Sequence, residues 1–215
     1  LLLHMDGANG SIVFTDSSSH ARTITRYSGA TIRTAVSKFG GACGEFSGLS
    51  SGYITAPASA DWGAHQDFTL EMWVRPEWNA RKEYLASTVD SGNTHNGWAL
   101  YKAASGAIGF SWWDSSDTLA TGETTTTLTV GAFAHVAVTV AGTTVRIYID
   151  GNLEKTDTHS VRPSSASRLL QIGRWFSGTG SPYFYGYLDD LRFTAGFALY
   201  TGASFSVPTA AYPDS

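Results

Sequence analysis

The sequence predicts an all-β protein built as a two-sheet antiparallel β-sandwich. Three observations support this prediction: a hairpin pattern across residues 133–152, a strongly alternating segment across residues 68–76, and no long segment with a helical period. The composition agrees, because Gly, Thr, Ser and aromatic residues are frequent while Lys and Glu are scarce. Such a composition favours strands and turns over helices.

The hairpin pattern is the clearest element of the chain. Every second residue from Val136 to Val140 is valine, and the same alternation continues from Val145 to Ile149. A period of two with β-branched residues on one side indicates a half-buried strand, and Gly142 lies where a tight turn is needed. A hairpin alone is unstable in water, so the valine face requires a second sheet to cover it.

The remaining segments supply further short strands. Every second residue from Phe68 to Val74 is large and apolar, which indicates a central strand that ends at Pro76. Residues 124–128 are either an edge strand or a loop. Other strands are expected at residues 1–6, 11–14, 31–35, 51–57, 84–89, 97–102, 107–113, 169–173 and 187–193. Ten or more short strands, several with one apolar face, favour two packed sheets.

Size and charge limit the classes of protein. The 215 residues contain no linker-like break, so we expect one domain over residues 1–215, with residues 194–215 as a tail packed on the sandwich. The net charge is −4 without a basic cluster, which argues against nucleic-acid binding. No apolar run approaches the length of a membrane-spanning helix, so we expect no membrane insertion. The chain begins with Leu1, and we expect a processed or excised fragment.

Cysteine chemistry is also limited. Cys43 is the one cysteine of the sequence, so neither an intramolecular disulfide nor a cysteine-based zinc cluster can form. A free cysteine is commonly buried, and no basic residue adjoins Cys43 to activate it. We therefore expect Cys43 to be a small packing residue.

Several segments in order resemble one known family. They are LLLHMDGANGSIVFTDSSSH, SKFGGACGEFSG, GYITAPASADWG, DFTLEMWVRPE, FAHVAVTV, VRIYIDGN, LLQIGR and GYLDDLRFTAGFALYTGASFSVPTAAYP. Together they resemble the laminin-G-like, concanavalin A-like jelly-roll domains, and more narrowly those of bacteriophage tail, fibre and other virion proteins. The resemblance covers essentially the whole chain. It departs at residues 133–135, Phe-Ala-His, where the family often has Trp-His-His.

Aromatic residues near strand ends and loops suggest a carbohydrate site. Sugar rings stack on aromatic faces while polar neighbours bind their hydroxyls, and exposed aromatic patches mark binding surfaces. The alternative is that half of these residues pack beneath long loops. The expected ligand-binding residues are Trp112, Trp113, Asp114, Asp117, Arg174, Trp175, Tyr183 and Tyr185. Trp62, Trp73 and Trp98 are expected in the core or on a sheet face.

Four aspartates suggest a structural calcium ion. The resemblance places the first and last strands side by side, which would bring together Asp6, Asp16, Asp189 and Asp190. Calcium prefers six to eight oxygen ligands in flexible geometry. In the alternative, the first two aspartates bond their own turns, and Asp189 accepts hydrogen bonds from a loop or pairs with Arg192 or Arg174.

Catalytic patterns are weak. Glycosidases of this architecture need two carboxylates in a cleft, but Glu71 and Glu77 are separated by Pro76, and we expect Glu71 to face Arg75. No Gly-x-Ser-x-Gly motif occurs, and the histidines lack metal-like spacing. The expectation is that the protein is not an enzyme.

These observations lead to three functional hypotheses. The first is a non-catalytic module of a phage virion or other displayed extracellular protein that binds host cell-surface carbohydrate for attachment. The second is a structural or decoration module whose aromatic loops contact a neighbouring virion protein. The third is a glycoside hydrolase or lyase, for which the sequence offers no carboxylate pair.

Overall fold

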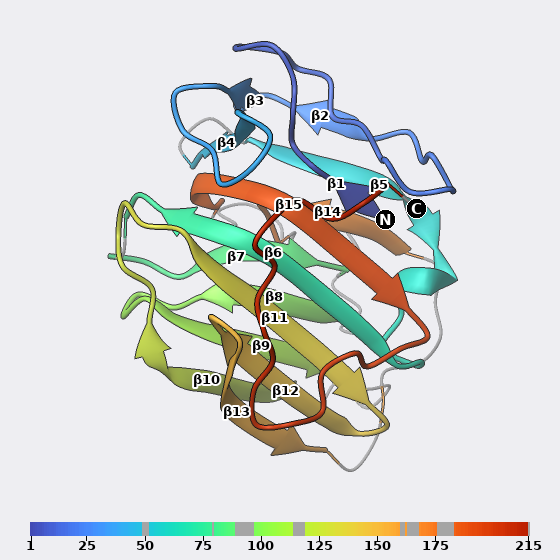
Figure 1. The fold of residues 1–215 in the computed structure, drawn as a ribbon. Coiled ribbons are helices and arrows are strands. Elements are labelled where there is room, and N and C mark those ends of the chain that lie inside the picture. Colours follow the sequence, from blue (N-terminus) through green and yellow to red (C-terminus); the bar gives the residue numbers. More distant parts are fainter. Residues whose placement is uncertain are drawn as a thin grey trace.

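The computed structural model describes residues 1–48, 52–78, 80–88, 97–113, 119–159, 162, 168–175 and 183–214, without the side chains of residues 119–121. Two antiparallel sheets form a sandwich in this part of the chain (Figure 1). The predicted fold class is therefore confirmed. A single turn of 3-10 helix, η1 (Ala60–Trp62), is the helical element of the described residues.

The first sheet has eight strands in the order β13-β12-β11-β6-β15-β4-β3, with β1 also paired to β15. Its members are β1 (Leu2–Leu3), β3 (Ala30–Arg33), β4 (Cys43–Ser47), β6 (Phe68–Pro76), β11 (Ala134–Ala141), β12 (Thr144–Ile149), β13 (Asn152–Thr158) and β15 (Tyr185–Ala195). The N-terminal β1 thus lies beside the C-terminal β15, as the resemblance implied.

The second sheet has seven strands in the order β10-β9-β8-β7-β14-β5-β2. Its members are β2 (Thr25–Tyr27), β5 (Tyr53–Ser59), β7 (Glu83–Ser87), β8 (Trp98–Lys102), β9 (Ala107–Trp113), β10 (Leu119–Thr127) and β14 (Arg168–Ile172). The threonine-rich segment belongs to edge strand β10. Residues 11–14 form no strand, although Ser11 accepts a hydrogen bond from Ile32 of β3.

The predicted hairpin is confirmed as β11 and β12. Val136 pairs with Ile149 and Val140 pairs with Val145, so the two apolar faces coincide. The valines of β11 are fully buried between the sheets. Trp98 of the other sheet is also fully buried in the same core cluster and stacks with Phe68, Phe110 and Phe193. The valine face is therefore covered as the sequence required.

The predicted packing residues are buried. Trp62 and Trp98 lie in the core, where the Trp98 Nε1–H donates to the Trp62 carbonyl, and Trp73 lies on the outer face of β6 beneath other residues. Cys43 is fully buried, its Sγ lies 3.0 Å from the Val36 carbonyl, and burial raises the pKa of its thiol to about 12. The thiol is thus a packing group and not a nucleophile at neutral pH.

The C-terminal segment crosses the outer face of the eight-stranded sheet (Figure 1). The Thr69 hydroxyl donates to the Phe197 carbonyl, and the Thr139 hydroxyl donates to the Tyr200 carbonyl. The Tyr148 hydroxyl donates to the Gly202 carbonyl. The backbone of the tail therefore satisfies polar side chains on the outer face of the eight-stranded sheet. The described part of the tail does not cross the outer face of the seven-stranded sheet (Figure 1).

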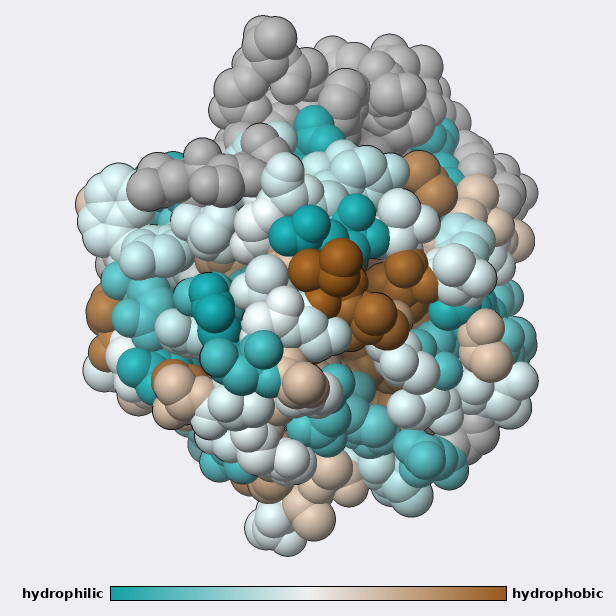
Figure 2. All heavy atoms as spheres, turned by 90° about the horizontal axis from the view of Figure 1, so that it is seen from above, coloured by the Kyte–Doolittle hydropathy of each residue, from teal (hydrophilic) through white to brown (hydrophobic). Residues whose placement is uncertain are grey.

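The edge formed by the N-terminal segment is mostly polar. Figure 2 shows a small apolar patch surrounded by polar side chains on this edge. Ile12 and Val13 are exposed apolar side chains of the N-terminal segment. No helix in the described part of the chain is long and apolar enough to cross a membrane.

Candidate functional site

The outer face of the seven-stranded sheet carries the candidate site. Side chains alternate along β8, so that Trp98 and Leu100 enter the core while Ala99 and Tyr101 face outward. The same alternation turns Tyr84 of β7 and Trp113 of β9 outward. An aromatic cluster thus forms on this face, outside the main core.

Small residues form the floor beneath this cluster. Ser87, Ala99 and Ser111 pair across three neighbouring strands and are buried. The Ser87 hydroxyl donates to the Arg174 carbonyl at 2.9 Å, which fixes the segment after β14 on the sheet. Small side chains leave room here for a large ring to lie over the strands.

Trp175 lies between two of the outward-facing aromatic residues. Its ring stacks nearly parallel to Trp113, with centroids 5.7 Å apart, and contacts Tyr84 at 4.9 Å. The Trp175 Nε1–H is buried and has no hydrogen-bond partner among the described residues. Buried donors are normally satisfied, so this N–H is available to water or to a ligand atom.

On the side of the aromatic cluster nearer β5, the guanidinium of Arg174 lies among tyrosine rings. The Arg174 guanidinium lies 4.7 Å from the centroid of the Tyr53 ring and 5.4 Å from that of Tyr183. Tyr27 of β2 stacks on Tyr53 at 4.1 Å. Burial raises the pKa of the Tyr53 hydroxyl, which therefore stays protonated at neutral pH. The arrangement offers flat apolar faces beside hydrogen-bond donors.

The opposite end of the cluster combines a tyrosine with two charged residues. The Tyr101 ring lies over Gly109, and its hydroxyl bonds the Glu123 carboxylate at 3.1 Å. The Lys82 Nζ lies 3.4 Å from the centroid of the same ring. Burial lowers the pKa of Lys82, although the charge of Glu123 opposes this shift.

The structure brings together four of the predicted ligand-binding residues: Trp113, Arg174, Trp175 and Tyr183. The first is mostly buried, and the other three are partly exposed. Both tyrosines of β5 and β2 in this cluster were missed by sequence reasoning. The signal for Tyr53 was the alternation in residues 53–56, Tyr-Ile-Thr-Ala, which places Tyr53 and Thr55 on the face opposite the core. Tyr27 of β2 pairs with Tyr53.

The other predicted ligand residues do not join the cluster. Trp112 faces the opposite way from Trp113, is 1% exposed and packs in the core, which corrects its assignment to the ligand site. Successive strand residues point to opposite faces, so neighbouring tryptophans cannot share a surface. Tyr185 belongs to β15 of the other sheet and is 38% exposed. Asp114 and Asp117 lie outside the described residues.

The aspartates expected to bind calcium already accept hydrogen bonds. Asp16 accepts the backbone N–H groups of Leu2, Ser18 and Arg22. Asp189 Oδ2 accepts the N–H groups of Lys38 and Phe39 in a loop, which is one of the predicted alternatives.

Asp190, another of the aspartates expected to bind calcium, also has hydrogen-bond partners within the chain. One oxygen contacts His4 Nδ1 at 2.7 Å and the other accepts the Tyr212 N–H. No group of three or more potential ligands is arranged around a cation position among the described residues. Asp6, the fourth aspartate of the predicted set, is exposed. Calcium binding stays a prediction that melting curves with chelator and with millimolar calcium test.

Glu71 has a different partner from the one expected. It binds Arg192 across to β15, with Arg192 Nη2 2.6 Å from its Oε1, while Arg75 pairs with Glu77. The expected Glu71–Arg75 pair is therefore wrong, because β15 lies beside β6 and offers a closer cation. Glu71 is fully buried beneath the tail.

Comparison with known proteins places the fold in a family. The family model described as the concanavalin A-like lectin/glucanases superfamily matches residues 47–196, well over half of the chain. The chain therefore belongs to the concanavalin A-like lectin/glucanase superfamily, as the segment resemblance implied. No curated protein matches the chain.

Solved structures of similar fold include the binding domain of botulinum neurotoxin serotype G. It has a TM-score of 0.68 and 16% identity, over 93% of this chain and 48% of that one. The ligand-binding domain of botulinum neurotoxin serotype D, in complex with N-acetylneuraminic acid, has a TM-score of 0.69 and 13% identity, over 93% of this chain and 48% of that one. A third structure is domain 4 of AbnA, a GH43 extracellular arabinanase from Geobacillus stearothermophilus, in complex with arabinotriose. It has a TM-score of 0.62 and 19% identity, over 82% of both chains. The chain spans about half the length of the toxin domains.

Proposed function

We propose that this chain is a non-catalytic carbohydrate-binding module, and that sugar binds on the outer face of the seven-stranded sheet. The observation that carries this proposal is the gathering of Trp175, Arg174, Tyr53 and Tyr183 on one face, where each is partly exposed. Flat rings accept the C–H face of a sugar, and the guanidinium donates to its hydroxyls. Ligand sites typically combine an aromatic surface with a small number of polar groups that point toward the ligand.

The comparisons support this proposal without naming a sugar. Domain 4 of AbnA is described in complex with arabinotriose, and the serotype D toxin domain in complex with N-acetylneuraminic acid. Both have the fold of this chain at low sequence identity. Function depends on the site and not on the fold, so the aromatic and cationic groups remain the main argument.

A finer proposal concerns the biological setting. We propose that the module belongs to a phage virion or another displayed extracellular protein and attaches it to cell-surface glycan. The support is the ordered set of segments that resembles virion proteins over the whole chain. Mass spectrometry of purified particles from the source of this sequence tests this setting, and absence of the chain from every particle would count against it.

One observation favours a second function. Tyr84, Tyr101 and Trp113 are no more than 7% exposed, because the chain's own side chains fill this end of the face. Aromatic side chains that are covered in this way leave little ring surface for a sugar, which favours a structural or decoration module that contacts a neighbouring subunit. Crosslinking in the assembled particle discriminates the two functions, because a covered Trp175 face favours the structural role.

We do not propose catalysis. Glu71, the carboxylate that the sequence singled out, is enclosed by Arg192, Tyr200 and His135 and cannot reach a substrate. A glycosidase needs two carboxylates on either side of a bound sugar. Incubation of the protein with any glycan that it binds, followed by product analysis, tests this point.

A glycan array followed by calorimetry tests the binding proposal. We expect Trp175→Ala and Tyr183→Ala each to weaken binding by about 30-fold, the effect of truncating an aromatic hot spot. Phe197→Ala is the matched control, because this aromatic side chain is 66% exposed and belongs to the tail that binds Thr69 of the eight-stranded sheet. Absence of any bound glycan at millimolar concentration, or binding that survives both substitutions, would overturn the proposal.

A further inference from the structure

A separate hollow of about 310 Å³ lies where the chain passes from β10 to β11 and so crosses from one sheet to the other. Its lining includes Thr126, Thr127, Thr129, Phe133 and Asp150. Ligand pockets in proteins begin at roughly 300 Å³. The hollow shares no residue with the aromatic face described above, so binding here does not depend on that face.

The crossing segment is held in place on both sides of the hollow. Leu128, between two of the lining threonines, is buried, and its N–H donates to the Gly106 carbonyl at 2.9 Å. The Gly131 N–H donates to the Pro76 carbonyl at 2.8 Å. Because Leu128 is anchored inward, Thr127 and Thr129 remain exposed on either side of it. A preformed site loses less entropy when a ligand binds.

Asp150 is fixed at the rim by two hydrogen bonds to one residue. Its N–H donates to the His135 carbonyl at 2.9 Å, and its Oδ1 accepts the His135 N–H at 2.8 Å. The residue has a left-handed backbone, with φ of 48°. Its Oδ2 has no hydrogen-bond partner within the described ranges of the chain. One carboxylate oxygen is therefore oriented by the fold, and the other is free to accept a ligand hydroxyl.

The charge at this edge selects against anions. Glu154 of β13 lies near the same threonines, because its Oε2 accepts the Thr126 N–H at 3.2 Å. Neither Glu154 nor Asp150 pairs with a lysine or arginine in the described part of the chain. Two unpaired carboxylates disfavour an acidic ligand, whereas hydroxyl groups donate to carboxylates, and donate to or accept from threonines, without a charge penalty.

We propose that this hollow is a second carbohydrate subsite that binds one neutral sugar unit. The half-buried ring of Phe133 contacts the C–H face of the sugar, and Asp150 with the threonine hydroxyls binds its hydroxyl groups. Two sites on different parts of one sandwich allow a branched or extended glycan to be held at two points, which raises avidity.

Titration of the ¹⁵N-labelled protein with neutral methyl glycosides, followed by NMR, tests the subsite. We expect a saturable change in the amide signals of residues 126–134 and 149–150 with at least one of the methyl glycosides of glucose, galactose, mannose, N-acetylglucosamine or arabinose. Thr127→Val and Phe133→Leu should each weaken this binding at least fivefold, about 1 kcal/mol. Thr158→Val, another exposed threonine on an edge strand, is the matched control and should leave it unchanged.

The outcomes separate this subsite from the aromatic face. Trp175→Ala should leave the titration of residues 126–134 unchanged, so failure of one site does not imply failure of the other. If no signal in these residues moves with any neutral glycoside while the protein is folded, the subsite is overturned. Tighter binding of glucuronic acid than of glucose at these residues would overturn its neutral selectivity.

Discussion

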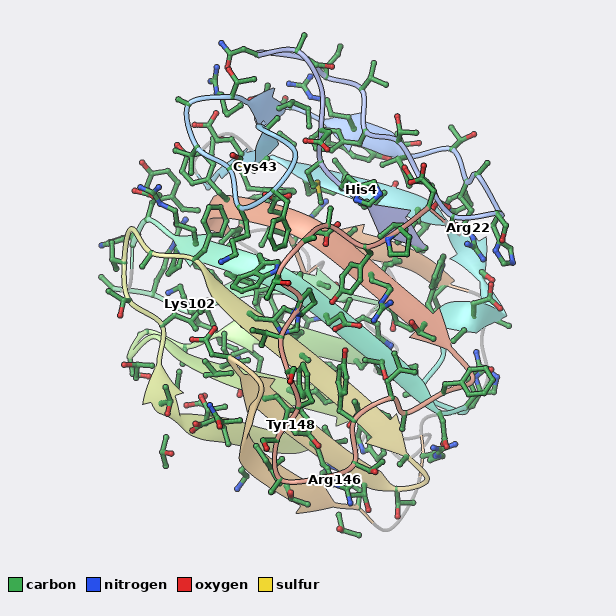
Figure 3. The ribbon with its side chains drawn as sticks, in the orientation of Figure 1. His4, Arg22, Cys43, Lys102, Arg146 and Tyr148 are labelled. Carbon is green, nitrogen blue, oxygen red and sulfur yellow. The ribbon has the colours of Figure 1, made fainter. Side chains whose placement is uncertain are left out.

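The guanidinium of Arg192 on β15 binds the carboxylate of Glu71 on β6 through two nitrogens, with Nε 2.9 Å and Nη2 2.6 Å from the same oxygen. Figure 3 draws the side chains of the same sheet, with Tyr148 of β12 labelled. The second oxygen accepts the Tyr200 hydroxyl of the C-terminal segment at 2.8 Å and lies 3.5 Å from His135 Nε2. Strands β6, β11 and β15 and the tail thus converge on one buried carboxylate.

Glu71→Gln should destabilise the fold and change its response to acid. Burial alone would raise the pKa of Glu71, but His135, Arg192 and Tyr212 outweigh burial and hold the pKa at about 2. The usual value is higher, so the charged carboxylate stabilises the native state at neutral pH, and this stabilisation is lost as the pH falls from about 5 toward 2. We expect a loss of about 3 kcal/mol at pH 7.

Urea unfolding at several pH values measures this effect. The wild-type protein should lose stability between pH 5 and 2, and the variant should lack that part of the loss. Glu77→Gln is the control, because its partner Arg75 and the carboxylate are both about a quarter exposed, and such pairs contribute less than about 1 kcal/mol. Equal effects of the two substitutions would contradict the prediction.

Asp189→Asn should stabilise the protein in alkaline solution. Burial raises the pKa of Asp189 to about 7, the charges of Asp190 and Asp6 add to this, and two backbone N–H donors oppose it. A pKa raised by folding means that the native state loses stability as the pH rises from about 4 through 7. An asparagine oxygen still accepts both N–H groups without a charge, so we expect a gain on the order of 3 kcal/mol at pH 8.

Melting temperatures at pH 4 and pH 8 check this prediction. The variant should melt close to the wild type at pH 4 and well above it at pH 8. Asp157→Asn on β13, where the carboxylate is partly exposed beside Lys155, should give no such alkaline gain. A variant that melts below the wild type at pH 8 would show that the carboxylate is needed in its charged form, as a bound cation would require.

Removal of residues 197–215 should destabilise the sandwich by several kcal/mol. The truncation leaves the hydroxyls of Thr69, Thr139 and Tyr148 without their backbone acceptors and uncovers Glu71. Each lost hydrogen bond of this kind costs about 1 kcal/mol. Dye binding to apolar surface should increase together with the loss of stability.

A shorter truncation provides the comparison. Removal of residues 214–215 alone takes away the contact between Asp214 and His4 but leaves the tail on the sheet. We expect a much smaller effect on denaturant unfolding. If both truncations unfold at the same urea concentration, the tail does not stabilise the eight-stranded sheet.

Gly109→Ala should disturb the aromatic face without touching the core. A Cβ at Gly109 would lie 2.2 Å from the Tyr101 ring, so the ring must move and its hydroxyl leaves Glu123. Overpacking of this kind costs roughly 1–3 kcal/mol. Gly202→Ala is the control, because no atom lies closer than 3.8 Å to its added Cβ. Similar unfolding midpoints for both variants would contradict the close approach of Tyr101.

Periodicity was sufficient to predict the long central strands, but it placed a strand at residues 11–14 that does not form and did not predict which strands are neighbours. The valines of β11 and the apolar face of β6 follow from a period of two, and the structure buries both. The same rule separates Trp112 from Trp113, although both had been assigned to one site. The partner of Glu71 was not predictable, because Arg75 is near in sequence while Arg192 is near only after β15 has paired with β6.

The sequence by itself determined the all-β class, the hairpin over residues 133–152 and the burial of Cys43, because alternation and side-chain hydrophobicity act locally along each strand. Only the tertiary structure decided which aromatic residues meet, since Trp113, Trp175 and Tyr84 come from separate segments that sheet pairing brings together. It also decided the partners of Asp189 and Asp190, whereas the bond from the nearby Ser18 N–H to Asp16 is the turn bond that the sequence offered as an alternative. A carboxylate takes the donors that surround it in space, and for Asp189 and Asp190 those donors lie far away along the sequence.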